Sequence, residues 1–423
     1  MSNEFVLQRY MEKHIMFPSF VSKKLRKDTH VIVVIPAYCE DRLKDSINAI
    51  LNCFEEYPYF EIIVVINQSV ADLDEIKLRH EIQSDDLRCD FSNLHNTNVH
   101  IIGPVEFDHK HAGVGWARKT GMDEAVRLFS SSGRLDGFII CFDADCTCDA
   151  SLISSVVDYF VAHRDIDALS IGFEHQLESC TDVEERKAII LYELHLRYYI
   201  EVQKYYSYPF AFQTIGSAMA VRVDAYCRMG GMNRRKAGED FYFLHKYSEI
   251  GKLGELKKTL VFPSSRRSNR VPFGTGKAVN QIILNNQNFQ TYSYEAIQKF
   301  CLAVKVLHTV RNWAQFLYQV NELDTDLGYF FVERKLQEKW EESEKNTSDM
   351  DSFKQRILAK FNAFELMKWL HRANQMAYPQ VEVFGQSVEF LKKCYPEIVP
   401  ESNFSVEQCL QVFRDLAKDL KVD

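Results

Sequence analysis

The sequence predicts an α/β fold in which a mostly parallel, doubly wound sheet is flanked by helices and followed by a helical C-terminal region. Over the first 150 residues, short apolar runs alternate with amphipathic helical patterns, which is typical of a parallel sheet with right-handed crossovers. After Gly276 the patterns are almost wholly helical. The apolar content of 46% is enough for a large core, and the length of 423 residues favours two domains.

The elements follow in order along the chain. The expected strands are the apolar runs His30–Pro36, Phe60–Ile66, Val99–Gly103 and Phe138–Phe142. The expected helices are the amphipathic segment that follows the first strand, then Asp72–Ile82, Gly115–Leu128 and the long Glu184–Gln203, which contains neither Gly nor Pro. These elements give a lead-in over residues 1–29, a sheet domain over 30–276 and a helical region over 277–423. The strongly charged stretch Glu333–Lys354 is either a solvated helix or a mobile connection.

Composition excludes several classes of protein. A net charge of −8 argues against a nucleic-acid-binding protein, because neutralising phosphates dominates such affinity. Eleven cysteines without a C-x-x-C pair, and an N-terminus without a signal-like apolar stretch, predict a reduced cytoplasmic protein. No apolar run is long enough to span a membrane.

The N-terminal lead-in is locally basic, with Lys23, Lys24, Arg26 and Lys27 beside apolar residues. Two interpretations remain open. The segment either contacts an anionic membrane surface at the inner face of the membrane, or forms a solvated approach to the first strand.

Two acids that follow a buried strand are the candidate metal ligands. Asp143 and Asp145 come directly after Phe138–Phe142, and open α/β sheets bind ligands beyond the carboxyl ends of their strands. Two hard oxygen ligands suit Mn²⁺ or Mg²⁺. By itself the pattern is equally consistent with an acidic turn that caps the next helix. Cys146 and Cys148 are expected to be packing residues rather than zinc ligands.

Several motifs occur in an order that resembles family 2 glycosyltransferases of the GT-A fold. In sequence they are I-P-A-Y-C-E-D, A-G-V-G-W-A-R-K-T-G, F-D-A-D-C, G-S-A-M-A-V-R, G-G-M-N and G-E-D-F, within roughly residues 30 to 276. The resemblance implies a metal-dependent enzyme that moves a sugar, with inversion, from a nucleotide-diphosphate donor to a hydroxyl acceptor in glycan or cell-surface polysaccharide synthesis. It also raises the metal interpretation of Asp143 and Asp145 above the capping one.

The resemblance assigns donor-side roles to particular residues. The expected nucleotide-sugar-binding residues are Pro36, Ala37, Tyr38, Glu40, Asn67, Gly113, Arg118, Asp143 and Ala144. At the second strand the family typically carries an acidic pair followed by Gly-Ser, whereas this chain has Asn67, Gln68 and Ser69, which leaves the base and its mode of contact open. Arg118 would pair with a phosphate or with a carboxylate of the Asp pair.

Three arginines downstream form a second donor-side group. Arg266, Arg267 and Arg270 are predicted to close over the diphosphate as clamps, the alternative being a solvated basic loop.

On the acceptor side, the resemblance places Gly216 and Ser217 beside the sugar. It makes Asp240 the general base and Glu239 a supporting acid. Many GT-A enzymes have a third metal ligand, a histidine, in this region, but no histidine lies between His245 and His308, so that ligand stays unassigned.

Two other functions remain as alternatives. A sugar-phosphate nucleotidyltransferase also places acids beyond a parallel sheet, but usually has a Gly-rich loop after the first strand, where this chain reads P-A-Y-C-E-D. A non-catalytic GT-A-fold binding protein would use the helical tail as its interaction surface. The tail is expected to dock a partner, form an oligomer or shape the acceptor cleft.

Overall fold

The computed structural model describes residues 2–92, 94, 98–236, 238–267, 274–286, 288–398 and 404–419. The chain forms two compact units. The first is made mainly of the residues up to Gln176 and of Thr214–Ser264, and the second of Leu177–Gln213 and the residues from Thr275 onward. The segment Leu177–Gln213, which the sequence ranges placed in the sheet domain, therefore groups with the C-terminal helices.

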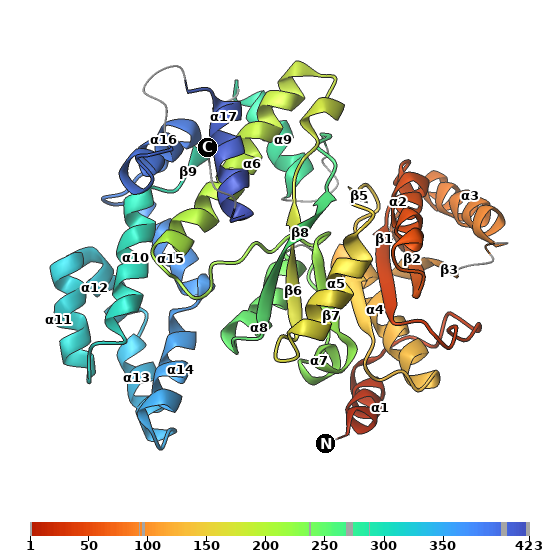
Figure 1. Cartoon of the computed structure of the whole chain (residues 1–423), viewed down its shortest axis with the longest axis horizontal. Coiled ribbons are helices and arrows are strands. Elements are labelled where there is room, and N and C mark those ends of the chain that lie inside the picture. Colours follow the sequence, from red (N-terminus) through yellow and green to blue (C-terminus); the bar gives the residue numbers. More distant parts are fainter. Residues whose placement is uncertain are drawn as a thin grey trace. The chain divides into compact units, whose positions relative to one another are not determined.

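The first unit is built on an eight-stranded sheet with the order β3-β2-β1-β4-β7-β6-β8-β5 (Figure 1). The strands are β1 Val31–Ala37, β2 Phe60–Ser69, β3 Val99–Phe107, β4 Phe138–Cys141, β5 Thr147–Cys148, β6 Ala168–Phe173, β7 Met219–Arg222 and β8 Leu253–Phe262. Neighbours β3, β2, β1 and β4 are parallel, as are β6 and β8, whereas β7 runs antiparallel to both β4 and β6. The four predicted strands are all present, and β1 and β2 are buried along their whole length.

Helices flank this sheet. They are α1 Asn3–His14, α2 Leu43–Leu51, α3 Asp74–Phe91, α4 Val114–Ser131, α5 Leu152–Ala162, α7 Val223–Arg228 and α8 Glu239–Glu249. Helix α4 packs on β1 and β2, and α5 packs on β8. The predicted α/β class is confirmed.

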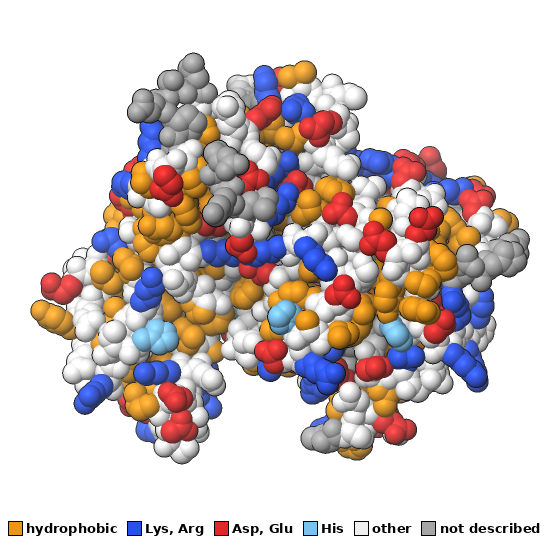
Figure 2. Space-filling view, in the orientation of Figure 1, with side chains coloured by type: hydrophobic (Ala, Val, Ile, Leu, Met, Phe, Trp, Pro, Cys, Tyr) orange, Lys and Arg blue, Asp and Glu red, His pale blue; other side chains and the backbone are white. Residues whose placement is uncertain are grey.

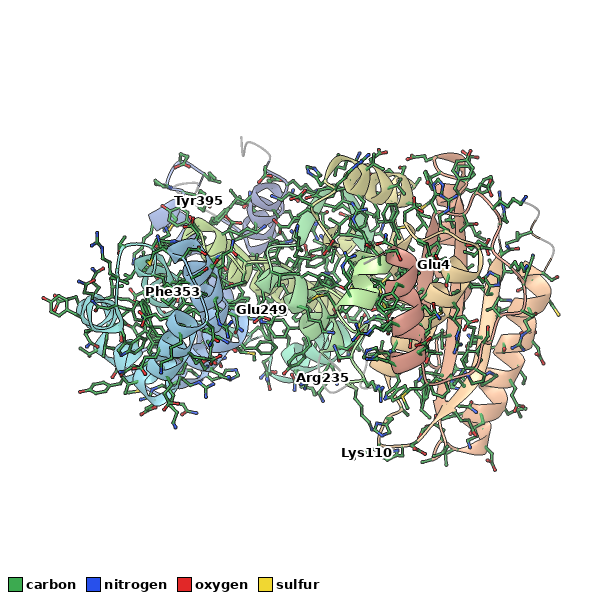
Figure 3. All side chains as sticks on the ribbon, turned by 90° about the horizontal axis from the view of Figure 1, so that it is seen from below. Glu4, Lys110, Arg235, Glu249, Phe353 and Tyr395 are labelled. Atoms are coloured by element: carbon green, nitrogen blue, oxygen red, sulfur yellow. The ribbon has the colours of Figure 1, made fainter. Side chains whose placement is uncertain are left out.

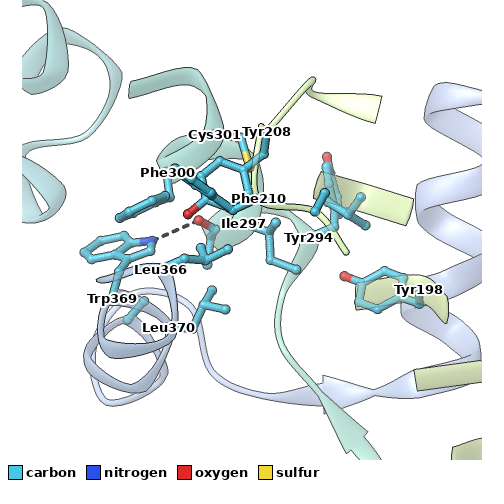
Figure 4. Close-up of a cluster of buried hydrophobic side chains, with 14 of the residues drawn as sticks. Tyr198, Tyr208, Phe210, Tyr294, Ile297, Phe300, Cys301, Leu366, Trp369 and Leu370 are labelled. Atoms are coloured by element: carbon cyan, nitrogen blue, oxygen red, sulfur yellow. Dashed lines mark hydrogen bonds between the residues drawn. The ribbon is translucent and has the colours of Figure 1, made fainter. Parts of the chain in front are cut away.

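The second unit is helical. Its elements are α6 Val183–Tyr205, α9 Thr275–Leu284, β9 Gln290–Thr291, α10 Tyr294–Val306, α11 Trp313–Leu323, α12 Thr325–Glu333, α13 Leu336–Lys345, α14 Met350–Leu358, α15 Ala363–Asn374, β10 Val381–Glu382, α16 Val383–Cys394 and α17 Val406–Ala417. Figure 4 shows part of its core, in which the indole N–H of Trp369 donates to the carbonyl of Ala296 at 2.9 Å. Tyr208 and Phe210 are buried in this core as packing residues.

The charged stretch Glu333–Lys354 contains helix α13 and the first turn of α14. Trp340 of α13 is 1% exposed and packs its ring against Trp313 and Phe353. The charges therefore cover the outer side of helices that are anchored by an apolar side chain.

The N-terminal segment packs against α4. The carboxylate of Glu124 accepts hydrogen bonds from the Ser19 hydroxyl and from the backbone N–H groups of Phe20 and Val21, and the ring of Phe17 lies against that of Trp116.

Among the described residues, no helix is both long and apolar enough to span a membrane. Acidic and basic side chains are interspersed on the face shown in Figure 2.

Candidate active site

The candidate site lies at the edge of the sheet where β1, β2 and β4 end. Because these three neighbouring strands are parallel, the residues that follow them meet at one edge. Tyr38 follows β1, Asn67 is near the end of β2, and Asp143 follows β4. The structure thus brings together three of the residues predicted for the donor side.

Arg118 of α4 is the centre of the site. Its guanidinium is 1% exposed and pairs with the carboxylate of Asp143 at 2.5 Å and with the carboxylate of Glu239. A planar fork between two carboxylates fixes the positions of both. The remaining Nε–H is buried without a hydrogen-bond partner among the described residues. Arg118 therefore links the acid after β4 to the acid at the start of α8.

Gly216, in the predicted acceptor-side segment, lies against the side chains of Arg118 and Asp240. A Cβ atom at this position would lie 2.9 Å from Nη1 of Arg118 and 3.0 Å from Oδ2 of Asp240. Only glycine therefore permits this approach without displacing one of the two side chains. The neighbouring Ser217 is 2% exposed, and its hydrogen bond to the Cys146 thiol opposes the rise in thiol pKa that burial causes. Four separate motifs of the sequence meet around one guanidinium.

The site carries more negative than positive charge. The carboxylates of Asp143, Glu239 and Asp240 all act on the guanidinium of Arg118. Burial raises the pKa of Glu239 and of Asp240, an effect that Arg118 opposes and that the neighbouring carboxylates reinforce. An excess of carboxylate over cation favours the binding of a further positive charge here.

Glu239 and Asp240 differ in their availability. Glu239 is 3% exposed and held by Arg118, and its backbone carbonyl accepts a hydrogen bond from the Asn233 amide at 2.7 Å. Asp240 is half-buried in the first turn of α8, where its Oδ1 accepts a hydrogen bond from the N–H of Phe241 at 2.7 Å. Gly238, with φ 71°, makes the turn into this helix. Asp240 is the more accessible of the two acids.

The loop after β1 is held by α3 and by the segment after β2. Tyr38 donates to Asp72 at 3.3 Å, and the carboxylate of Glu40 accepts from the N–H of Arg42 at 3.1 Å. Between them, the N–H of Cys39, a residue with φ 49°, donates to Nε2 of His80 at 3.1 Å. Pro36 and Ala37 are buried in β1.

His80 and Asp72 were not among the residues predicted for the site. The sequence carries no local signal for their roles, because both lie far along the chain from the loop that they hold. Nδ1 of His80 is 3.1 Å from Oε1 of Gln68, so Gln68 acts in the scaffold. Asn67 is 4% exposed at the end of β2. Its side-chain amide has both donor and acceptor atoms, which suits contact with a base edge.

The donor set for a metal consists of oxygen atoms. Asp143 and Asp145 are partly exposed on either side of the buried Ala144, but the described residues contain no group of three or more His, Cys, Asp or Glu arranged to hold an ion. Mg²⁺ is usually bound by one or two carboxylates together with phosphate oxygens and water. Two carboxylates beside a phosphate site therefore fit Mg²⁺ or Mn²⁺, and the third protein ligand remains unassigned.

The remaining predicted residues have other surroundings. Gly113 precedes α4 and lies close to the backbone of Lys236. Arg266 and Arg267 group with the second unit. Arg266 is half-buried, and Arg267 pairs within that unit with Asp182 at 3.0 Å and with Glu185 at 2.9 Å. Arg270 lies outside the described residues. The clamp role of these arginines stays a prediction.

Comparison with known proteins gives a family match. Residues 32–226 match the model of glycosyl transferase family 2. No curated protein sequence matches the chain. Similar solved structures include S. aureus TarS 1-349, with 12% identity, a TM-score of 0.39 and coverage of 92% of this chain and 90% of that one.

Another similar structure is the mannosyltransferase PcManGT from Pyrobaculum calidifontis in complex with GDP-Man and Mn2+. It has 12% identity, a TM-score of 0.38 and coverage of 99% of this chain and 94% of that one. The family match and the mostly parallel sheet confirm the predicted GT-A fold class with its helical C-terminal region. The chain therefore carries a glycosyl transferase family 2 domain over residues 32–226, and it is a glycosyltransferase.

Proposed function

We propose that this glycosyltransferase is metal-dependent and inverting, and that it moves a sugar from a nucleotide-diphosphate donor to a hydroxyl acceptor. The observation that carries the proposal is the guanidinium of Arg118, which joins Asp143 after β4 to Glu239 beside Asp240. A donor-side acid and an acceptor-side acid are thereby held next to each other, as a displacement between two substrates requires.

On the donor side, Tyr38, Glu40 and Asn67 would contact the nucleoside, and Asp143 and Asp145 would hold Mn²⁺ or Mg²⁺. The bound ion would neutralise the charge that develops on the leaving diphosphate. Arg118 then has two roles. It orients Asp143, and its buried Nε–H is a further donor within the site.

On the acceptor side, Asp240 would accept the proton of the attacking hydroxyl. The oxygen of the acceptor hydroxyl would then bond to the anomeric carbon from the face opposite the diphosphate. The bond from that carbon to the diphosphate oxygen would break. A raised pKa suits a general base, because a carboxylate with a higher proton affinity accepts the proton of a hydroxyl more readily. Glu239, fixed by Arg118, would position the first turn of α8.

The test is turnover by the purified full-length chain with a panel of uridine, guanosine, cytidine and deoxythymidine diphosphate sugars in Mn²⁺, in Mg²⁺ and in EDTA. We expect metal-dependent release of a nucleoside diphosphate. Asp240→Asn should lower turnover by about 100-fold or more while leaving nucleoside diphosphate affinity within about twofold. Asp145→Ala should abolish the metal dependence of nucleotide binding.

The matched control is Asp158→Asn on α5, an acid whose side chain is 70% exposed and which should have no effect. Inversion is checked by NMR of the anomeric proton in the first product formed. The proposal is wrong if no member of the panel releases a nucleoside diphosphate, or if Asp145→Ala binds nucleotide in Mn²⁺ as well as the unmodified protein does.

A further inference from the structure

Two loops of the first unit carry basic side chains and lie just before the N-terminal ends of α4 and α8. Residues 109–111 read His-Lys-His after β3, and residues 234–236 read Arg-Arg-Lys before α8. His109, Lys110 and all of residues 234–236 are exposed. Asp108 precedes the first loop, which still leaves an excess of positive charge in a chain whose net charge is −8. We refer to residues 109–111 and 234–236 as the basic loop pair.

The two loops are tied to each other and to α4. The ammonium of Lys236 donates to the carbonyl of His109 at 2.7 Å. A Cβ atom on Gly115 would lie 2.1 Å from the carbonyl oxygen of Arg235, so the second loop rests directly on the backbone of the first turn of α4. The basic loop pair is therefore a built surface rather than two independent loops.

The two arginines of the basic loop pair lie against aromatic rings. The guanidinium of Arg234 lies 4.9 Å from the ring centre of Trp116, and that of Arg235 lies 3.6 Å from the ring centre of Tyr242. Such contacts orient a guanidinium without neutralising it. In the described part of the chain, none of the four Lys and Arg residues of the pair forms an ion pair, whereas other exposed cations of this unit do, such as Lys44 with Asp90. Oriented cations without counter-ions favour an anionic ligand.

The basic loop pair adjoins the acceptor side of the candidate site. Its second loop is followed directly by the turn into Glu239 and Asp240, and Asn233, the residue before it, donates to the carbonyl of Glu239 at 2.7 Å. Trp116, whose ring contacts the guanidinium of Arg234, is two residues before Arg118 on α4. Lys110 and Arg235 both lie toward the lower edge of the molecule in Figure 3.

We propose that the basic loop pair binds a phosphate group of the acceptor, so that the acceptor is a phosphorylated hydroxyl compound. This inference rests on the proposed function. A phosphate group offers several oxygens to guanidinium forks and ammonium groups at once, which matches two arginines and two lysines on neighbouring loops. The phosphate would anchor the acceptor while a separate hydroxyl reaches Asp240.

The test compares the unmodified full-length chain with Arg234→Gln/Lys236→Gln, with the single variant Lys110→Gln, and with the control Lys44→Gln/Lys258→Gln. The control removes the same charge from exposed residues elsewhere in the first unit. Calorimetry gives the affinity for glycerol 3-phosphate, glucose 6-phosphate and inorganic phosphate, with glycerol and glucose as phosphate-free partners. Flotation with vesicles of phosphatidylglycerol measures binding to lipid phosphates. Nucleoside diphosphate affinity is measured in Mn²⁺ for every protein.

We expect the phosphorylated compounds to bind and the phosphate-free partners not to bind. The double variant should weaken phosphate binding by about tenfold or more, and Lys110→Gln should weaken it less. The control should bind phosphate as the unmodified chain does, and nucleoside diphosphate affinity should stay unchanged throughout. If lipid is the source of the phosphate, vesicle binding falls in the double variant in parallel.

Three results would overturn the inference. Equal phosphate affinity in the double variant and the control would show a surface without a binding role. A loss of nucleoside diphosphate affinity instead of phosphate affinity would assign these cations to the donor. Failure of the unmodified chain to distinguish glucose 6-phosphate from glucose would exclude a phosphate site. The calorimetric measurement of phosphate affinity needs no turnover. Its result can therefore be distinguished from a failure of the proposed transferase activity.

Discussion

Replacing Arg118 with methionine tests the central feature of the site. Methionine retains most of the side-chain length but removes the cation that pairs with Asp143 and Glu239. Arg118 and Glu239 are 1% and 3% exposed, so the pair is inaccessible to water. Breaking a buried pair by removing one partner costs about 3–5 kcal/mol, because the other charge stays buried. The pair with Asp143 adds less, since the side chain of that acid is 37% exposed.

The loss should depend on pH in a defined direction. Burial already raises the pKa of Glu239 above its usual 4.5, and removing the guanidinium raises it further. A carboxyl with a raised pKa in the folded state contributes stability below the unfolded pKa, and that contribution is lost as pH rises through the folded pKa. Protonation of Glu239 therefore removes most of the variant's loss of stability at low pH. We expect the free energy of unfolding of the variant to be slightly below that of the unmodified chain at pH 5, and about 3–5 kcal/mol below it at pH 8.

The assay is hydrogen exchange of the α4 and β4 peptides, which reports on the first unit separately, together with urea denaturation at both pH values. The matched control is Arg127→Met on the same helix. Arg127 is 23% exposed and also donates to the carbonyl of Phe17, and its buried partner Glu124 keeps hydrogen bonds from residues 19–21, so we expect a smaller cost of about 1–2 kcal/mol. Equal stability of Arg118→Met and the unmodified chain at pH 8, or an equal deficit at pH 5 and pH 8, would refute the buried-pair reasoning.

Three further predictions follow from single contacts. Gly115→Ala places a Cβ atom 2.1 Å from the carbonyl of Arg235 and should lower the melting temperature by at least about 4 °C in a thermal melt, since the backbone must shift. Burial lowers the pKa of His195 from its usual 6.5 to about 4, so the second unit should lose stability as pH falls from 6.5 to 4, by at most about 3 kcal/mol, and His195→Gln should flatten this dependence in urea denaturation. Arg414→Met leaves the fully buried Glu193 without one of its arginine partners, with N–O distances of 2.8 and 2.9 Å, and should cost about 3 kcal/mol in the same assay; no loss would mean that α17 is held by apolar contacts alone.

The strands were predictable because burial on both faces leaves a continuous apolar run in the sequence. The runs at 31–37 and 60–66 are such segments, and the predicted strand at Phe138–Phe142 differs from β4 by one residue. The grouping of Leu177–Gln213 with the C-terminal helices was not predictable. A helical period shows which face of α6 is apolar, but not which partner covers that face.

The sequence alone determined the class of fold, the order of the motifs and the identity of the acids after β4 and at the start of α8, because these depend on residue types and local spacing. Only the tertiary structure decided that Arg118 pairs with both Asp143 and Glu239, that Gly216 admits Asp240 to the same guanidinium, and that His80 and Asp72 hold the loop after β1. The same holds for the basic loop pair, whose two halves are more than 120 residues apart along the chain and meet through the hydrogen bond from Lys236 to His109. Contacts between distant segments depend on how helices pack onto the sheet, and local sequence patterns do not encode that packing.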